Sequence, residues 1–516
     1  MVILKKGWEE FCKKAAFEKL ALEELKREAE TGFDAYQVYP ESINVLEGCL
    51  LFLARTDEGK KLVVMKDGPS RLFEDFTGET LELEGKEIKL APLDHSNAVA
   101  IRKWFPFTAP VAFGKEGTSI GLGDRLGVAS PGHLRIIKKT KVRPVLAQQS
   151  IRELTLTQRT YEDVLDAATW AVFQEGYRSG FSADGDHLKT EAEVKMALEL
   201  GFTMITLDCS EKINNGASSM PEDQVEREYQ NLPEEYRNAI ETDYLGREFS
   251  VQDFKITFDK IELQRIALIY GEAMSFIKHI YFDLIKPAGR AVDFEVSIDE
   301  TLTPTTPQAH FFVASELQKM GVEVTSLAPR FCGEFQKGVD YIGDLTQFEK
   351  EFKVHAAIAD HFGYRLSIHS GSDKFKVFPV IGKYTKGRVH VKTAGTNWLE
   401  ALRVIAGKEP ALFREIYEFA LKNFDDAKKY YHVSADPAAV PDVKNMPDEE
   451  LPQVLAQNDA RQILHITYGS ILTAKDERGN YLFKDRIYNA LGDYEEDYYE
   501  ALEKHIGRHL SSLGVV

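Results

Sequence analysis

The sequence has few cysteines: only Cys12, Cys49, Cys209 and Cys332, which stand far apart and form no C-x-x-C pair. This spacing excludes a disulfide framework and a zinc site built on paired thiolates, and it favours a reducing compartment. The chain also lacks an apolar run of the roughly 18 residues that a membrane-spanning helix requires. Its opening, MVILKKGWEEFCKK, has too short an apolar stretch for a signal peptide. We therefore expect a cytoplasmic protein that does not span a membrane.

Basic residues are in deficit. Lys and Arg number 64 against 82 Asp and Glu, which gives a formal net charge of −18, and no stretch concentrates Lys and Arg. Such a surface repels a polyphosphate backbone, so we do not expect nucleic acid as a partner. Gly121-Leu122-Gly123 lacks the third glycine of a dinucleotide fingerprint, which gives a nicotinamide cofactor little support. Homo-oligomerisation stays open.

The chain is long enough for more than one folding unit, because 516 residues exceed the roughly 150 of an average domain. Residues 7–30 have the apolar spacing of an amphipathic helix. Two β-type hairpin patterns follow, one turning at Asp57-Glu58-Gly59 and the other at Glu84-Gly85. These features predict a small N-terminal α+β domain over residues 1–112.

The sequence pattern changes near residue 115. From there on, short β-rich runs alternate with helical patterns that often start at Thr or Ser and stop at Gly. Eight such runs occur, at 118–127, 143–150, 180–187, 202–210, 293–300, 324–331, 364–372 and 388–396. Eight strand-helix units predict an α/β fold, a (β/α)8 TIM barrel over residues 113–408. We expect the polar insert 211–250 to form a lid or a surface excursion, and residues 409–516 to form a helical C-terminal extension.

The active site of such a barrel lies at the carboxyl ends of its strands, where the loops converge. His187, His369 and His390 fall at the ends of the third, seventh and eighth predicted strands. Three neutral imidazoles suit a divalent metal ion with an open position for substrate, although any one of them alone is better explained as a strand cap or as the partner of a backbone carbonyl. Lys374 or Lys392 is an alternative as a Schiff-base lysine, but the nearby histidines favour metal. Further polar residues at these strand ends are Gln148, Ser150, Asp186, Glu295, Arg330, Cys332, Ser370 and Asn397.

The segment FSADGDHLKTEAEVKMALELGFTMITLDCS (181–210) resembles the strand-helix-strand segment of class II, zinc-dependent ketose aldolases, with Asp186-His187 at the position of their Asp-His pair. YRLSIHSGSDK (364–374) resembles the strand end that carries their second metal histidine, and RVHVKTAGTNWLEALR (388–403) resembles their final strand and helix. Their third metal histidine corresponds to Cys332 in RFCGEFQKG. The resemblance therefore leaves His390, Glu295 or Cys332 as the third ligand.

Over its whole length the chain resembles the tagaturonate epimerases, which interconvert tagaturonate and fructuronate. The resemblance implies a metal-dependent inversion at C4 of a 2-keto hexuronic acid, by retro-aldol cleavage of C3–C4 and re-closure through a metal-stabilised enediolate. One divalent ion (zinc, manganese, cobalt or nickel) is expected on His187, His369 and His390. Asp186 and Glu295 are expected to move the C4 hydroxyl proton on opposite faces.

The small-molecule keto sugar acid is expected to be bound by polar side chains around the metal. Arg330, Lys374 and Lys392 are the candidates for its carboxylate. The wider set of expected substrate-binding residues is Gln148, Ser150, Arg330, Ser370, Lys374, Lys392 and Asn397. Alternative hypotheses are a class II-type aldolase or an epimerase of another ketose or ketose phosphate, and a sugar-binding protein without catalysis.

Overall fold

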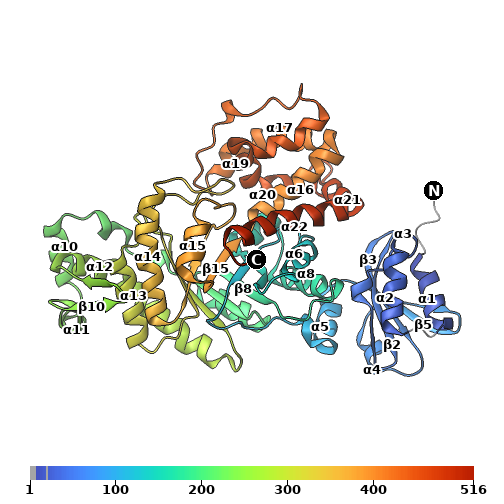
Figure 1. The fold of residues 1–516 in the computed structure, drawn as a ribbon, viewed down its shortest axis with the longest axis horizontal. Helices are drawn as coiled ribbons and strands as arrows, with labels where there is room; N and C mark the ends of the chain where they lie inside the picture. The colour runs from blue at the N-terminus through green and yellow to red at the C-terminus, as the bar shows by residue number, and fades with distance from the viewer. Residues whose placement is uncertain (1–6, 19–20) are drawn as a thin grey trace.

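The computed structural model describes residues 7–18 and 21–516, so the first six residues of the predicted N-terminal domain and residues 19 and 20 of the predicted helix lie outside it. Figure 1 shows the N-terminal region at one end of the molecule, the barrel in the middle and the C-terminal helices packed over the barrel. The predicted helix 7–30 is two helices, α1 (Gly7–Glu18) and α2 (Leu22–Thr31), followed by α3 (Phe33–Tyr36).

The N-terminal region contains an antiparallel sheet in the order β1-β2-β3-β5-β4. Both predicted hairpins form. Glu84 and Gly85 have φ of 52° and 75°, which is the left-handed pair that a two-residue hairpin turn requires. The elements are β1 (Asn44–Leu46), β2 (Cys49–Thr56), β3 (Gly59–Lys66), α4 (Arg71–Asp75), β4 (Glu79–Leu83), β5 (Lys86–Pro92) and α5 (His95–Trp104).

Alternate residues of β2 supply two separate cores, because successive side chains of a strand point to opposite faces. Phe52 packs with Phe11 and Leu25 under α1 and α2. Leu51 belongs to a second cluster that includes Trp170 and Phe173 of the barrel helix α8 (Tyr161–Gln174). The sheet is therefore packed directly against the barrel.

Each of the eight predicted runs contains one strand of a closed barrel, which confirms the predicted TIM-barrel fold. All neighbouring strands pair in parallel. The strands are β6 (Ser119–Leu122), β7 (Arg143–Ser150), β8 (Ser182–Leu188), β9 (Met204–Asp208), β12 (Asp293–Ile298), β13 (Ser326–Pro329), β14 (Arg365–Ile368) and β15 (Val389–Thr393).

Helices surround this barrel, and several begin where the sequence predicts. Thr160 and Thr190 accept the capping hydrogen bonds of α8 and α9, and α14 stops at Gly363, whose φ is 77°. Besides α8, the helices are α6 (Ser130–Ile137), α7 (Ile151–Thr157), α9 (Glu191–Glu199), α12 (Lys260–Ile280), α13 (Pro307–Lys319), α14 (Leu345–Phe362), α15 (Phe378–Thr385) and α16 (Gly395–Lys408). Short 3-10 or π turns complete the chain at Pro40–Ser42, Pro106–Thr108, Ser210–Lys212, Asn215–Ser219, Tyr281–Ile285, Lys286–Ala288, Pro437–Ala439 and Asp448–Ala456.

The insert after β9 contains α10 (Glu222–Gln230), α11 (Glu234–Tyr244) and the hairpin β10 (Glu248–Val251) and β11 (Phe254–Thr257). Its aromatic side chains hold it on the outer face of α13: the Phe249 ring lies 4.8 Å from that of Phe311, and the Tyr244 ring 5.1 Å from that of Phe312. Figure 1 shows the insert at the end of the molecule remote from the N-terminal region. No residue of 211–250 lines the cavity described below, so the insert is a surface excursion and not a lid.

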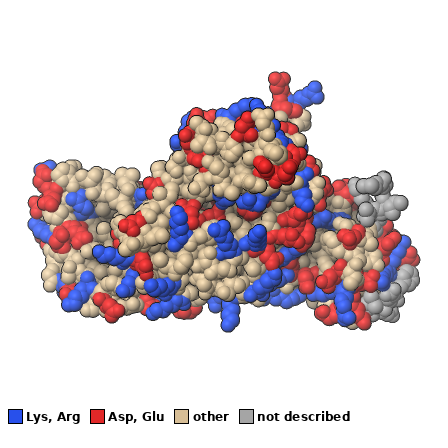
Figure 2. Space-filling view, turned by 45° about the horizontal axis from the view of Figure 1, so that its top comes forward, with Lys and Arg blue, Asp and Glu red and all other residues tan. Residues whose placement is uncertain are grey.

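The C-terminal helices are α17 (Pro410–Lys422), α18 (Phe424–Lys428), α19 (Asn458–Ile466), α20 (Tyr468–Thr473), α21 (Lys484–Asp493) and α22 (Glu495–Ser512). They share a core with α16, built on residues such as Trp398, Phe413 and Ile463. No helix among the described residues is long and apolar enough to cross a membrane. On the face drawn in Figure 2, acidic and basic side chains are interspersed.

Candidate active site

The carboxyl ends of the barrel strands open into a cavity of about 700 Å³. Part of its wall comes from the loop after β13 and from the C-terminal helical region, which contributes Tyr430, Tyr431, His432 and His465. The predicted site residues that line it are Gln148, Ser150, Asp186, His187, Arg330, His369, Ser370, Lys374 and Lys392, whereas Glu295, His390 and Asn397 do not.

His187 and His369 lie side by side in this cavity, with ring centroids 4.8 Å apart. Each ring has one nitrogen held by a carboxylate: His187 Nδ1 lies 2.7 Å from Asp186 Oδ1, and His369 Nε2 lies 2.8 Å from Glu295 Oε1. His187 also has φ of 55°, an unfavourable value for a non-glycine residue that marks a constrained position. The second ring nitrogen of each histidine is thereby left for another ligand.

Asp299, immediately after β12, completes the group. Ligand atoms of His187, His369 and Asp299 lie within 4.8 Å of one another, a set that can hold a metal ion. Asp299 Oδ2 lies 3.3 Å from His369 Nδ1. Burial works against a charged imidazole, but Asp299 together with the hydrogen bond to Glu295 raises the pKa of His369 to about 10. The surroundings of His369 therefore favour a positive charge.

Lys392 stands at the centre of the barrel mouth. Its ammonium lies 2.8 Å from Asp184 Oδ2, 2.6 Å from Asp186 Oδ1 and 3.0 Å from Glu295 Oε1, and it donates to Thr206 Oγ1 at 2.6 Å. Burial opposes its charge, but these carboxylates raise its pKa well above the ordinary value. Lys392 in turn keeps the pKa of Asp186 well below the ordinary range. The lysine is thus a fixed cation among acids and not a free amine for a Schiff base.

Glu295 is completely buried and lies beneath the cavity. Oε1 contacts His369 and Lys392, and Oε2 accepts from Ser326 Oγ at 2.5 Å. Thr206 Oγ1 also donates to Oε1 at 3.3 Å. The structure therefore places Glu295 where it orients His369, and not where it touches a substrate.

His390 does not join the two other histidines. It pairs in the sheet with Ser367, two residues before His369, and so lies one level deeper in the barrel. Its Nδ1 lies 2.8 Å from Ser119 Oγ, and burial lowers its pKa to about 3. Cys332, the other alternative ligand, packs in the apolar core, where burial raises the pKa of its thiol to about 12.

Three of the expected substrate-binding residues have structural partners. The Lys374 ammonium donates to the backbone carbonyls of Gln336, Val339 and Ser372, and burial lowers its pKa to about 7. The Arg330 guanidinium donates to the carbonyl of Thr301. Asn397 lies inside α16 and donates to the carbonyl of Gly123 at 2.8 Å.

Gln148, Ser150 and Ser370 keep polar atoms at the cavity. Gln148 donates to Asp186 Oδ2 at 3.4 Å, and its Oε1 is buried without a hydrogen-bond partner among the described residues. A side chain at Gly121 would overlap this Oε1, since a Cβ there would lie 1.7 Å away, so the Gly-Leu-Gly segment makes room for the glutamine. Ser150 caps α7 with the same hydroxyl that faces the cavity.

A family model described as tagaturonate epimerase matches residues 39–513. The chain belongs to the tagaturonate epimerase family. It is 44% identical over 479 residues, 93% of this chain and 97% of the other, to the tagaturonate/fructuronate epimerase of Thermotoga maritima.

Solved structures agree with this membership. The fructuronate-tagaturonate epimerase of Cohnella laeviribosi, crystallised with one glycerol, is 52% identical and has a TM-score of 0.91, covering 96% of this chain and 100% of that one. Its native crystal structure gives the same identity and TM-score over 95% and 99%. As a member of the epimerase family, the protein is an isomerase, and the family resemblance drawn from the sequence is confirmed.

The sequence patterns did not identify Asp299 as a partner of the two cavity histidines. A signal was available: Glu295, Ser297 and Asp299 have the spacing of two that puts side chains on one face of a strand, and Asp299 is the last of them. Asp184 and Thr206, which hold Lys392, follow the same alternation on β8 and β9. Lys337 and His465 come from loops and helices outside the strand pattern, so no periodicity could have indicated them.

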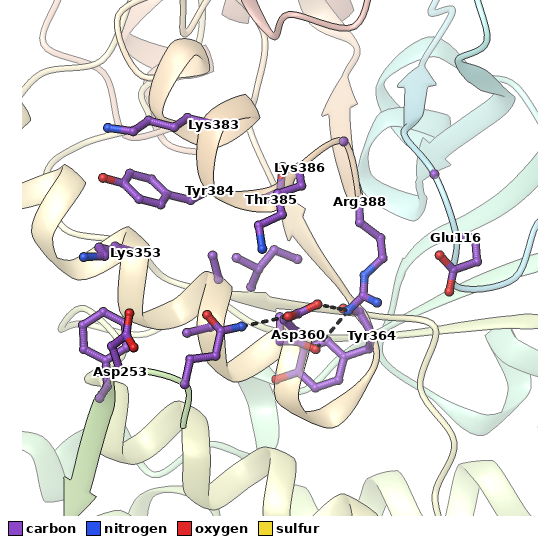
Figure 3. A pocket seen from close by; sticks show the side chains of 18 residues that line it. Glu116, Asp253, Lys353, Asp360, Tyr364, Lys383, Tyr384, Thr385, Lys386 and Arg388 are labelled. Carbon is purple, nitrogen blue, oxygen red and sulfur yellow. Dashed lines mark hydrogen bonds and ion pairs between the residues drawn. The ribbon is translucent and has the colours of Figure 1, made fainter. Parts of the chain in front are cut away.

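A second, smaller cavity of about 290 Å³ lies at the opposite, amino-terminal end of the strands (Figure 3). Two of its polar side chains share one carboxylate: Arg388 lies 3.3 Å from Asp360, and Gln252 donates to the same carboxylate at 2.7 Å. We expect the chemistry in the mouth cavity, because the imidazoles and the acid cluster are there and the active sites of such barrels lie at this end.

Proposed function

We propose that this chain interconverts tagaturonate and fructuronate, an inversion at C4 of a 2-keto hexuronic acid, and that one divalent metal ion (zinc, manganese, cobalt or nickel) is required. Family membership and the names of its relatives support the reaction. The observation that carries the metal is the pair of cavity imidazoles, each fixed by a carboxylate and both beside Asp299. The four free, buried cysteines fit a cytoplasmic location.

The donor set fits a divalent cation. A carboxylate on the far nitrogen of a histidine fixes its tautomer and orientation, as is usual for metal-binding histidines. His369 Nδ1 is buried and makes no hydrogen bond in the described part of the chain, although Asp299 Oδ2 lies 3.3 Å from it. The carboxylates of Asp184, Asp186 and Glu295 surround the ammonium of Lys392, and Asp299 lies beside His369, so the site has negative charge to offset. We therefore assign the metal to His187, His369 and Asp299.

A bound divalent cation supplies Lewis-acid polarisation of a ketose carbonyl. The chain itself supplies proton handling. We propose that Asp186, which lines the cavity and is held by Lys392 and His187, accepts the proton of the C4 hydroxyl as the C3–C4 bond breaks. C4 becomes an aldehyde carbonyl, and the electron pair of the broken bond passes to C3 and the C2 carbonyl, which form an enediolate. When the bond re-forms, the enediolate returns this electron pair to C4 and Asp186 returns the proton to the C4 oxygen. Rotation of the C4–C6 fragment between these events inverts C4.

Removal and return of metal test the proposal. Chelator-treated protein is expected to leave tagaturonate unchanged, and one equivalent of a suitable divalent ion is expected to restore fructuronate, followed by ¹³C NMR. Full turnover by protein shown to be metal-free would contradict the metal requirement. Absence of fructuronate with every ion would contradict the reaction.

Bond cleavage is tested separately in the active protein. Retro-aldol cleavage predicts a small release of dihydroxyacetone during turnover of tagaturonate, measured by trapping it enzymatically. Turnover in deuterium oxide is expected to leave C4 without deuterium. Deuterium at C4 would instead indicate deprotonation at that carbon and would remove the retro-aldol step.

A further inference from the structure

One wall of the mouth cavity contains cations that the protein does not neutralise. Lys337 donates to Ser370 Oγ at 3.0 Å, and the Arg152 guanidinium lies 4.8 Å from the centre of the Tyr431 ring. Neither forms an ion pair with a carboxylate of residues 7–18 or 21–516. Most acids of the cavity are paired elsewhere: Glu153 lies 2.6 Å from Arg125, and Asp186 is held by Lys392.

His465 lies on the same wall and has no partner. Its side chain is 1% exposed, and neither ring nitrogen has a hydrogen-bond partner among the described residues. Buried polar atoms are rarely left without a partner unless a ligand or water supplies one. Burial and the positive charges of Arg125, Lys337, Arg461 and Lys374 lower the pKa of His465 well below its ordinary value, so the ring is neutral and has one N–H to donate.

The N-terminus of the 14-residue helix α16 meets His465. Ala394 and Gly395 line the cavity, and no side chain caps the helix. A Cβ at Gly395 would lie 2.0 Å from His465 Nε2, so the absence of a side chain there lets the imidazole approach the first turn. The free N–H groups of a first helical turn, with the positive end of the helix dipole, favour an anion.

We propose that Lys337, His465 and the N-terminus of α16 bind the carboxylate of the sugar acid, with Arg152 at the outer edge. The subsite adjoins the chemical centre, since Lys337 contacts Ser370, the residue after His369. Arg330, Lys374 and Lys392, which the sequence suggested for the carboxylate, are not assigned to it. Their charged groups are held by backbone carbonyls or by acids. This inference rests on the proposed function for the identity of the ligand.

The test compares tagaturonate with tagatose, its neutral counterpart. Lys337→Gln is expected to lower kcat/KM for tagaturonate on the order of 10- to 100-fold, the effect of losing one hydrogen bond to a charged group. kcat/KM for tagatose is expected to stay within about twofold. Lys383→Gln, in the second cavity of Figure 3, is the matched control and should change neither value. An equal loss on both substrates, or no loss on tagaturonate, would overturn the assignment.

Calorimetry with unreactive ligands separates this inference from the proposed reaction. Wild-type protein is expected to bind galactonate more tightly than the neutral polyol galactitol, and Lys337→Gln and Arg152→Gln should each reduce that preference. If the wild type turns over neither ketose but binds galactonate in this way, the reaction is wrong and the anion subsite stands. Equal affinity of the wild type for galactonate and galactitol would contradict the proposed anion subsite.

Discussion

Each cavity histidine has one ring nitrogen held by a carboxylate, and the two carboxylates differ in position. Asp186 lines the cavity, whereas Glu295 is enclosed by His369, Lys392 and Ser326. We infer different roles from this difference. Asp186 can touch a substrate, and Glu295 acts only through His369 and Lys392.

Glu295→Gln is expected to weaken metal binding about 10- to 100-fold, because an amide no longer fixes the tautomer of His369 as a carboxylate does. The measurement is competition with a chromophoric chelator. Glu300→Gln is the matched control, since Glu300 also lines the cavity but contacts neither histidine. Unchanged affinity in Glu295→Gln would show that the buried carboxylate does not position the imidazole.

In protein saturated with metal, Asp186→Asn is expected to lose about 10²- to 10⁴-fold in kcat, the usual contribution of a general base. Its metal affinity is expected to fall as that of Glu295→Gln does, because Asp186 also fixes a histidine, His187. Metal content and steady-state turnover of tagaturonate are measured on the same preparation. A variant that retains most of its kcat would exclude Asp186 as the proton acceptor.

His390→Gln distinguishes the structure from the expectation drawn from strand ends. His390 lies one level below His369 and contacts Ser119, so the variant is expected to retain the full metal content of the wild type, measured by inductively coupled plasma mass spectrometry. Loss of metal together with an unchanged circular dichroism spectrum would restore His390 as a ligand.

The reason why the sequence could not exclude His390 is geometrical. Alternation along β15 puts His390 and Lys392 on the same inner face, but the level that each side chain reaches depends on the stagger of neighbouring strands, which only the closed barrel defines. His187 and His369 were predictable because each ends its strand. Asp299 shared the alternation of β12, yet its position beside His369 depends on the pairing across the barrel.

At the scale of elements, local rules predicted most of the architecture. Turn residues predicted both N-terminal hairpins. Thr at helix N-caps and Gly at helix C-termini predicted the barrel helices. The contacts between distant elements were not predictable, because they join residues hundreds of positions apart. The clearest example is Glu495 at the start of α22, which forms ion pairs with Arg55 and Lys60 of the N-terminal sheet.

The ion pairs of Glu495 with Arg55 and Lys60 predict that the stability of the fold depends on pH. Burial opposes ionisation of Glu495, but Lys60 and Arg55 lower its pKa from 4.5 to about 2. A carboxylate with a lowered pKa stabilises the fold fully above the unfolded value, near 4.5, and that stabilisation is lost as pH falls through about 2.

Calorimetric scans of wild type and Glu495→Gln check this expectation. The variant is expected to unfold at lower temperature at pH 6, and the difference should shrink steadily between pH 4.5 and pH 2. Glu496→Gln is the control, because Glu496 is the exposed neighbour. If the unfolding temperatures of wild type and Glu495→Gln differ by the same amount at pH 6 and at pH 2.5, the effect comes from packing and not from the charge of Glu495.

At the scale of the whole molecule, the three regions have separate tasks. The N-terminal sheet packs on α8 and is anchored by α22, the barrel holds the imidazoles and acids, and the C-terminal helices close one side of the cavity with His465 and Tyr431 (Figure 1). The insert lies on the outer face of α13. The cavity is therefore lined by the barrel and by the C-terminal region together, and we expect both to contact the substrate.

Metal content per chain tests the central claim most directly, namely that side chains from separate strands of one barrel hold a single cation. Mass spectrometry of wild-type protein saturated with one ion and freed of excess is expected to give one metal ion per chain. His187→Ala, His369→Ala and Asp299→Ala are each expected to give almost none while keeping the wild-type circular dichroism spectrum. One full equivalent of metal in the folded His187→Ala and His369→Ala variants would contradict the account.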